Sequence, residues 1–127
     1  MCSSDLLREA LREYGCEDIR IFAKIENMTG VEHLEELIPY CDYIVIARGD
    51  LGNAMPLSQL PRIQAHIARV CRKHNKDFMI VTQMLDSMIK NPYPTRAEVN
   101  DIYHAVTQGA STLMLTGETA HGKDIFC

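Results

Sequence analysis

Ala23-Lys24-Ile25-Glu26-Asn27 and Ala47-Arg48-Gly49-Asp50-Leu51-Gly52 are the two stretches of sequence that decide the fold of this chain. Each is a polar cluster that closes an apolar, β-branched run, at residues 19–22 before the first and 43–46 before the second. Short apolar runs bounded by turn signals are typical of buried parallel strands. The ends of such strands form the rim where barrels and open α/β sheets keep their active sites.

Four charged side chains are therefore expected together at this rim. Glu26 and Asp50 would come from neighbouring strand ends, with Lys24 and Arg48 beside them. Two hard oxygen donors suit Mg²⁺ or Mn²⁺, and cationic neighbours suit an anionic substrate. Alternate residues of a strand also point the same way, so Lys24 and Glu26 taken alone could be a surface charge pattern. The two clusters together favour a divalent-metal site.

Helices and strands are expected to alternate along the chain. The first strand ends at Glu26, and further strands are predicted over residues 43–47, 78–81 and 113–115. Between them we predict a loop at residues 49–52, a long helix ending near His74 and a short helix at 85–89. This order predicts an α/β fold of parallel β/α units.

Capping signals mark the other helices. The pattern at residues 5–14 places leucines on one face before Gly15, a typical helix-ending residue. Thr29 and Glu32 have capping-box spacing and open a helix whose apolar face continues to residue 38. Thr95 and Glu98 have the same spacing. The helix that they open is expected to bury four residues: Val99, Ile102, Tyr103 and Val106.

Length, net charge, apolar runs and cysteine content limit the classes of protein to which the chain can belong. The 127 residues suit one domain, and a net charge of −4 argues against sequence-independent nucleic-acid binding. No apolar run approaches the roughly 20 residues of a membrane span, and the N-terminus lacks signal-peptide features. Five scattered cysteines favour reduced thiols. We therefore expect a cytoplasmic protein that binds neither membranes nor nucleic acids.

Five motifs together resemble one family, that of pyruvate kinase. The two clusters quoted above occur in the family's order with three further motifs: Thr82-Gln83-Met84-Leu85-Asp86-Ser87-Met88, Pro94-Thr95-Arg96-Ala97-Glu98 and Gly117-Glu118-Thr119-Ala120. The match covers nearly the whole chain. Residues 1–127 resemble a single segment, the second half of that enzyme's (β/α)₈ barrel with its fifth to eighth strands. The fold implied is half of a TIM-type barrel.

The resemblance implies phosphoryl transfer between phosphoenolpyruvate and ADP, giving pyruvate and ATP in glycolysis. Glu26 and Asp50 would ligate Mg²⁺ or Mn²⁺. Lys24 would offset charge on the enolate and phosphoryl oxygens, as preorganised cations do in phosphoryl transfer. Arg48 and Gly49, with Asp50, would line the substrate carboxylate through backbone N–H groups at a helix start.

Three further residues receive roles from the resemblance. Thr82 would contact the substrate near its carboxylate and methylene carbon, and Thr116 and Glu118 would lie near the route by which a proton reaches the enolate. Thr82 and Thr116 could equally be β-favouring residues at strand ends. K⁺ is expected for the family, but its ligands, like much of the ADP contact, belong to the half of the barrel that has no counterpart here.

The chain departs from the family most in length, since a whole barrel takes about 250 residues. The lid and C-terminal domains also have no counterpart in residues 1–127. A half barrel exposes unpaired strand edges, near Ile21 and Met114, and leaves its inner face half covered. We therefore expect a homo-oligomer or association with the complementary half barrel. His121 also stands where many family members carry lysine.

Two alternative functions use the same rim. A metal-dependent pyruvate-enolate lyase, of the 2-keto acid aldolase type, would stabilise the same enolate with Glu26, Asp50 and a divalent ion but would need no nucleotide. A catalytically incompetent half-barrel module would retain the residues at the strand ends only by descent and would not use them in catalysis. The Lys24 and Thr82 motifs favour the kinase over the lyase.

Overall fold

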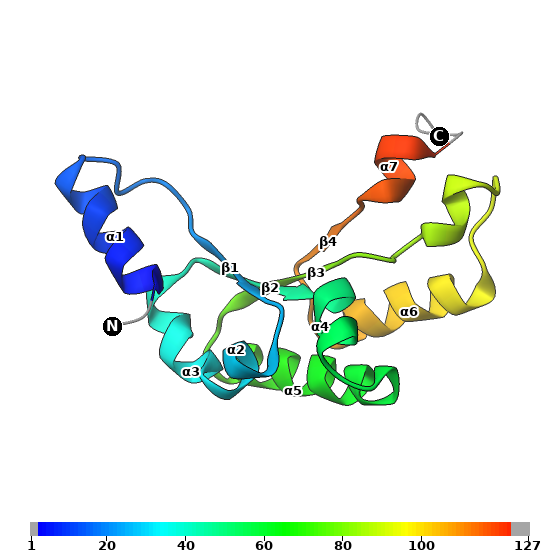
Figure 1. The fold of residues 1–127 in the computed structure, drawn as a ribbon, viewed down its shortest axis with the longest axis horizontal. Helices are drawn as coiled ribbons and strands as arrows, with labels where there is room; N and C mark the ends of the chain where they lie inside the picture. Colours follow the sequence, from blue (N-terminus) through cyan, green and yellow to red (C-terminus); the bar gives the residue numbers. More distant parts are fainter. Residues whose placement is uncertain (1–2, 123–127) are drawn as a thin grey trace.

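The computed structural model of this chain describes residues 3–122 and contains one parallel sheet (Figure 1). Its strands are β1 (Phe22–Ile25), β2 (Tyr43–Ala47), β3 (Asp77–Val81) and β4 (Thr112–Met114). They lie in the order β1-β2-β3-β4, and every neighbouring pair is parallel. The predicted α/β fold of parallel units is confirmed, with β1 and β4 as its edges.

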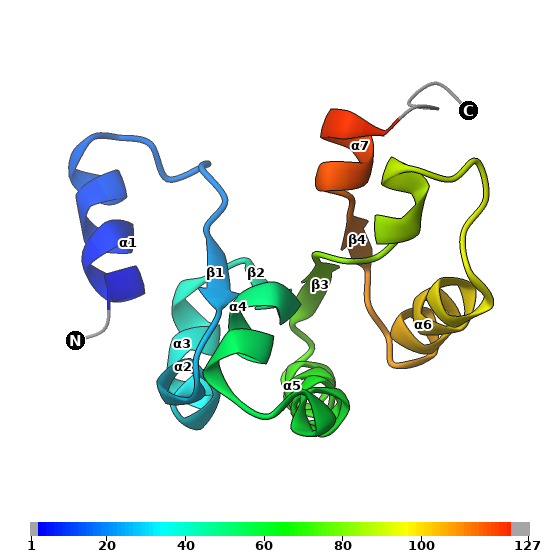
Figure 2. The same cartoon turned by 45° about the vertical axis from the view of Figure 1, so that its right-hand side comes forward.

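Helices connect the strands and cover one side of them. The α-helices are α1 (Ser3–Glu13), α2 (Met28–Glu32), α3 (Leu34–Leu37), α4 (Arg48–Ala54), α5 (Leu60–Lys73), α6 (Arg96–Thr107) and α7 (Gly117–His121). The short 3₁₀ helices between these elements are η1 (Ile38–Tyr40), η2 (Leu57–Gln59) and η3 (Asp86–Ile89). Figure 2 shows α1 on the left beyond β1 and α7 at the top above β4, with α6 at the right-hand end. Within residues 3–122 no helix has the length and apolar composition that crossing a bilayer requires.

The core lies between the sheet and these helices. Alternate strand residues point to opposite faces, so one face of β2 and β3 delivers a row of fully buried side chains to the helices. Those side chains are Ile44, Ile46, Phe78 and Ile80. Leu34 of α3 and Ile67 of α5 pack into the same cluster. Full burial of each such side chain stabilises the fold by about 1.5–3 kcal/mol.

The opposite face of the sheet carries a much smaller apolar cluster. Val45, Ala47 and Val81 are buried there, with Met79 packed against them. Toward β1 the rings of Phe22 and Tyr43 stack with their centroids 4.7 Å apart. Phe22 is nevertheless about half exposed. The sheet of the described residues therefore has one covered face and one partly open face, as a half barrel requires.

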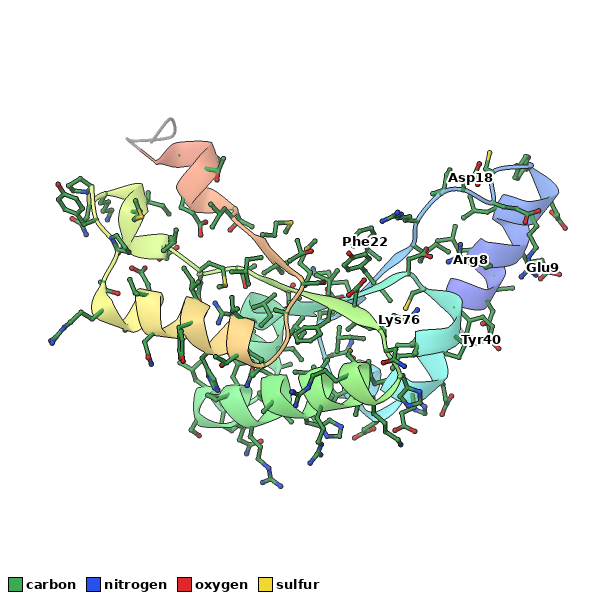
Figure 3. The ribbon with its side chains drawn as sticks, turned by 180° about the vertical axis from the view of Figure 1, so that it is seen from behind. Arg8, Glu9, Asp18, Phe22, Tyr40 and Lys76 are labelled. Carbon is green, nitrogen blue, oxygen red and sulfur yellow. The ribbon has the colours of Figure 1, made fainter. Side chains whose placement is uncertain are left out.

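Polar contacts join helix α1 to the rest of the molecule, in addition to the packing of Leu11 against the core. Figure 3 shows Arg8 on the side of α1 that faces the body of the molecule and Glu9 on the other side. Arg8 donates to the Asp42 carboxylate at 2.9 Å, and the same carboxylate accepts from the N–H of Ile21. These contacts, with desolvation opposing them, hold the pKa of Asp42 below its usual range.

The loop predicted at residues 49–52 is wrong, because these residues belong to helix α4. Gly49 and Gly52 suggested a break in the chain, but a glycine lowers helix stability without forbidding a helix. Leu51 is fully buried, and its burial compensates for the two glycines. Asp50 therefore lies in the first turn of a helix.

Several predicted boundaries also shift. The helix expected from Thr29 is capped instead by Asn27, whose side chain accepts from the N–H of Gly30 at 2.9 Å. It breaks at His33 into α2 and α3. The first strand begins at Phe22, and the fourth strand starts and ends one residue earlier than predicted. The capping box of Thr95 and Glu98 is confirmed.

The burial predicted for the apolar residues of helix α6 is mostly wrong. Val99, Tyr103 and Val106 were expected in the core, but they are 54%, 69% and 56% exposed. Only Ile102 of the four predicted residues packs against the core, beside the buried Ala105. Hydrophobic periodicity cannot distinguish a helix face that packs on the core from one that faces outward.

Candidate active site

The predicted metal ligands meet at a single nitrogen atom. Lys24 Nζ lies 2.8 Å from Glu26 Oε2 and 2.8 Å from Asp50 Oδ2. Lys24 is on β1 and Glu26 directly follows that strand, so both side chains leave on the same side. Asp50 arrives from the first turn of α4, directly after the neighbouring strand β2. The two carboxylate oxygens are therefore within twice 2.8 Å of each other.

These two carboxylates favour the charged form of Lys24. Its hydrogen bond to Asp50, and then that to Glu26, raises the pKa of the ammonium group above its usual value. All three side chains remain about half exposed, so the cluster is open to ions and small anions. Lys24 is therefore a cation at neutral pH that both acidic side chains already hold in place.

The donor set fits Mg²⁺ or Mn²⁺. Within residues 3–122 no group of three or more His, Cys, Asp or Glu side chains is placed to hold a metal ion. Mg²⁺, however, is commonly bound through one or two carboxylates, with water and substrate phosphate oxygens completing its coordination. Glu26 and Asp50 can supply those carboxylates, and Lys24 shows that a cation can sit between them.

Arg48 points away from this cluster into the protein. Its guanidinium is 9% exposed and donates through Nη1 to Asp101 Oδ2 of α6 at 2.6 Å. Through Nη2 it donates to the backbone carbonyl oxygens of Thr82 and Gln83, at 2.9 Å and 3.2 Å. The predicted role of Arg48 concerned its backbone; the side chain instead joins α4 to the end of β3 and to α6.

Thr82 and Gly49 contact each other directly. The Gly49 N–H donates to Thr82 Oγ1 at 2.8 Å, and the Thr82 hydroxyl donates to the Val81 carbonyl at 2.6 Å. A Cβ atom on Gly49 would lie only 3.3 Å from Thr82 Oγ1. Because Gly49 has no side chain, the Thr82 hydroxyl can approach its backbone nitrogen closely. The hydroxyl thus contacts the residue that precedes Asp50 in the sequence.

Thr116 and Glu118 form a separate group at the end of β4. Glu118 is buried, and its carboxylate accepts from the Leu85 N–H at 3.0 Å, the Thr116 N–H at 2.9 Å and the Thr116 hydroxyl at 3.2 Å. Desolvation opposes ionisation of Glu118, but these hydrogen bonds outweigh it and lower the pKa. Among the described residues, no hydrogen bond or ion pair joins this group to Lys24, Glu26 or Asp50.

Sequence patterns missed Asp101 and the backbone groups of Gln83 and Leu85. Asp101 lies on a helix remote in sequence from Arg48, and no local signal marks it as the partner of a buried arginine. The φ angles of Thr82 and Gln83, 71° and 54°, are also invisible in the sequence because neither residue is glycine. Only the folded arrangement shows that these groups belong to the site.

A groove of about 720 Å³ lies elsewhere, between α2 and α5. Its walls carry exposed arginines such as Arg62 and Arg69, together with apolar residues such as Val31. None of the predicted site residues lines it. The residues at the strand ends and this groove are therefore in different parts of the described surface.

The chain is similar to one family model and to several curated proteins. The family model "Pyruvate kinase, barrel domain" matches residues 3–124. "Pyruvate kinase" of Clostridium acetobutylicum is 46% identical over 117 residues, which are 92% of this chain and 25% of the relative. "Pyruvate kinase" of Aeropyrum pernix is 50% identical over 117 residues, which are 92% of this chain and 26% of the relative. The chain thus spans about a quarter of the length of the relatives that it matches.

Proposed function

This chain belongs to the pyruvate kinase family, and on that basis we propose that it carries the metal and phosphoenolpyruvate side of a phosphoryl-transfer site. The reaction is transfer between phosphoenolpyruvate and ADP, giving pyruvate and ATP. The observation that carries this proposal is the convergence of Glu26 and Asp50 on Lys24 at the ends of two adjacent parallel strands.

The acidic pair has the role of holding the divalent ion. Glu26 and Asp50 would bind Mg²⁺ or Mn²⁺, which when bound supplies positive charge to the oxygens of the transferring phosphoryl group. Catalysis of phosphoryl transfer consists largely of positioning and charge stabilisation, so fixed carboxylates are suited to it. No described residue is proposed to bind K⁺.

Lys24 supplies a second, permanent positive charge. The ammonium group of a lysine is protonated at neutral pH, and the neighbouring carboxylates raise the pKa of Lys24 further. Charge that develops on the enolate and phosphoryl oxygens would be stabilised by this ammonium group, which Glu26 and Asp50 position in advance.

The remaining residues would orient the substrate and supply a proton. The start of α4, with Arg48, Gly49 and Asp50, would line the substrate carboxylate, although the Gly49 N–H already donates to Thr82. Thr82 would contact the substrate beside that carboxylate. Thr116 would lie near the proton route, with Glu118 accepting its hydroxyl hydrogen and fixing its orientation.

Phosphorus NMR tests whether phosphoenolpyruvate binds beside the metal. With the chain and Mn²⁺ present, we expect faster ³¹P relaxation of phosphoenolpyruvate than Mn²⁺ alone produces, because chain, metal and substrate form one complex. Lys24→Met should reduce this effect about tenfold or more by removing the fixed cation. Glu9→Gln, on the outer side of α1, is the matched control. Relaxation unaffected by the chain would contradict the proposal.

The nucleotide requirement separates the kinase from the lyase. Pyruvate release that depends on ADP, measured with the chain and a complementary half barrel, supports the kinase. Turnover of pyruvate or oxaloacetate without any nucleotide would support the lyase instead. The Lys24 ion pairs favour the kinase, because a fixed ammonium group suits a transferring phosphoryl group.

A further inference from the structure

Thr82 and Gln83 adopt an unfavourable backbone conformation at the end of β3. Their φ angles are 71° and 54°, in the left-handed region that residues with side chains rarely occupy. The conformation is least favourable for a β-branched residue such as Thr82. Such conformations persist only where the surrounding structure compels them, and they concentrate at functional sites.

The Arg48 guanidinium supplies the contacts that favour this conformation. One nitrogen, Nη2, donates to the carbonyl oxygens of both residues, at 2.9 Å for Thr82 and 3.2 Å for Gln83. The same nitrogen lies 3.0 Å from the sulfur of the buried Met84. The two carbonyl groups therefore converge on one buried donor, which they can do only while the chain turns sharply between them.

Asp101 fixes the other side of the guanidinium. Its carboxylate accepts from Nη1 at 2.6 Å, and Asp101 is itself held on helix α6. A planar guanidinium has donors in fixed directions, so anchoring Nη1 also orients Nη2. A lysine at position 48 could not reproduce this arrangement, because its ammonium group acts as a single point charge.

We propose that Arg48 is a positioning residue whose guanidinium, oriented by Asp101, holds Thr82 and Gln83 in the left-handed conformation. This conformation keeps Thr82 Oγ1 2.8 Å from the Gly49 nitrogen, next to the metal ligand Asp50. Without Arg48 the turn would relax to negative φ, and the hydroxyl would leave Gly49. Asp101 is thereby a second positioning residue. The link to substrate binding rests on the proposed function, whereas the link to the conformation of Thr82 does not.

Amide hydrogen exchange of Gly49 reports this contact directly. In Asp101→Asn and Arg48→Lys we expect the Gly49 amide to exchange about tenfold faster or more, because its acceptor moves away. The backbone chemical shifts of Thr82 and Gln83 should move toward values of negative φ. Thr82→Val, which removes the acceptor, gives the exchange rate for complete loss of the contact. Glu9→Gln should leave the rate unchanged.

Core amides separate a local effect from general destabilisation. Ile46 and Ile80 lie in the sheet, and their exchange reports global unfolding. We expect their rates to change less than that of Gly49. If Arg48→Lys fails to fold, Asp101→Asn decides alone, because its carboxylate is partly exposed and asparagine keeps its size. Unchanged Gly49 exchange in Asp101→Asn, with faster exchange in Thr82→Val, would overturn the proposal.

A second measurement links the contact to the substrate. The Mn²⁺-dependent ³¹P relaxation of phosphoenolpyruvate should weaken in Asp101→Asn, although Asp101 touches neither metal nor substrate. Relaxation equal to that of the unaltered chain would overturn the link between Asp101 and the substrate. If the unaltered chain gives no relaxation effect, the proposed function fails, while Gly49 exchange still decides the role of Arg48.

Discussion

Lys24 lies between the two carboxylates to which the proposed function assigns the divalent cation. Its ammonium group lies 2.8 Å from an oxygen of Glu26 and 2.8 Å from an oxygen of Asp50. Under that proposal the metal ion and Lys24 would share the negative charge of the two carboxylates. Both positive charges would then lie where phosphoryl transfer requires them.

Gly49 gives the first prediction, because its hydrogen atom faces Thr82. In Gly49→Ala the new Cβ would lie 3.3 Å from Thr82 Oγ1, which is closer than most such contacts. The Thr82 hydroxyl would have to move away, which would weaken its hydrogen bond with the N–H of residue 49. We expect this strain to cost about 1 kcal/mol of unfolding free energy, offsetting the helix propensity that alanine adds.

Gly52→Ala is the matched control on the same helix. Its Cβ would meet Leu57 at 3.5 Å, an ordinary contact, so alanine should stabilise α4 by roughly 0.5–1 kcal/mol. Urea denaturation of both variants measures the difference. Equal stabilisation by the two substitutions would show that Thr82 does not press against Gly49.

At the level of elements, Glu98 joins η3 to the start of α6. Its carboxylate accepts from the Ser87 N–H at 2.8 Å and the Ser87 hydroxyl at 2.6 Å, and it completes the capping box with Thr95. Desolvation opposes ionisation, but these hydrogen bonds outweigh it and lower the pKa of Glu98 to about 2. The segment between β3 and α6 therefore depends on an ionised carboxylate.

This lowered pKa predicts how stability varies with pH. A carboxyl group with a lower pKa in the folded state stabilises fully above its unfolded pKa, near 4.5, and loses that effect as pH falls toward about 2. Glu98→Gln should therefore cost about 1–2 kcal/mol at pH 6. The cost should shrink between pH 4.5 and pH 2.

Urea midpoints of the two proteins at pH 6 and pH 3 check this prediction. Glu9→Gln, which removes an exposed carboxylate without a hydrogen-bond partner among the described residues, should match the unaltered chain at both values. A destabilisation by Glu98→Gln that is equally large at both values would show that the ionised carboxylate is not responsible.

The sequence predicted most elements because their signals are local. The strand at residues 43–47 is a continuous apolar run, and Thr95 and Glu98 form a capping box that needs only three-residue spacing. The residue pattern predicted a loop at 49–52, because the stability of α4 comes from burial of Leu51, a tertiary contact that outweighs two glycines. The helix start at Arg48 and Gly49 that the resemblance implied is confirmed. Local patterns thus identify elements where propensity and packing agree.

The contacts of the candidate site also fall into those that local patterns predict and those that depend on packing. The proximity of Glu26, Asp50 and Lys24 was predictable because each is at or near the end of a parallel strand, and the ends of neighbouring strands must meet. The contacts of Arg48 with Asp101, Thr82 and Gln83 were not predictable, since they depend on how α6 packs beside the sheet. Contacts that arise from packing between elements therefore escape sequence reasoning.

Among the described residues, two exposed apolar surfaces bear on association of the whole molecule. One is the open face of the sheet, where Phe22 and Met114 are about half exposed near its two edges. The other is the outer face of α6, formed by Val99, Tyr103 and Val106. Exposed apolar patches beside unpaired strand edges are typical of surfaces that bind a partner.

We therefore predict that the chain associates at micromolar concentration, either with itself or with a complementary half barrel. Phe22→Asp should abolish association through the sheet, and Tyr103→Asp should abolish association through α6. Size-exclusion chromatography with light scattering distinguishes the two surfaces. A monodisperse monomer that also fails to bind the complementary half barrel would contradict the prediction.

Mn²⁺ binding tests most directly whether Glu26 and Asp50 share one ion. Free Mn²⁺ is measured by electron paramagnetic resonance during titration of the chain and of the Glu26→Gln, Asp50→Asn and double variants. Each single substitution should weaken binding about tenfold or more, and the double variant should be less than additive because the two ligands hold the same ion. Glu9→Gln should bind as the unaltered chain does. Affinity unchanged by either single substitution would show that the two carboxylates do not form a metal site.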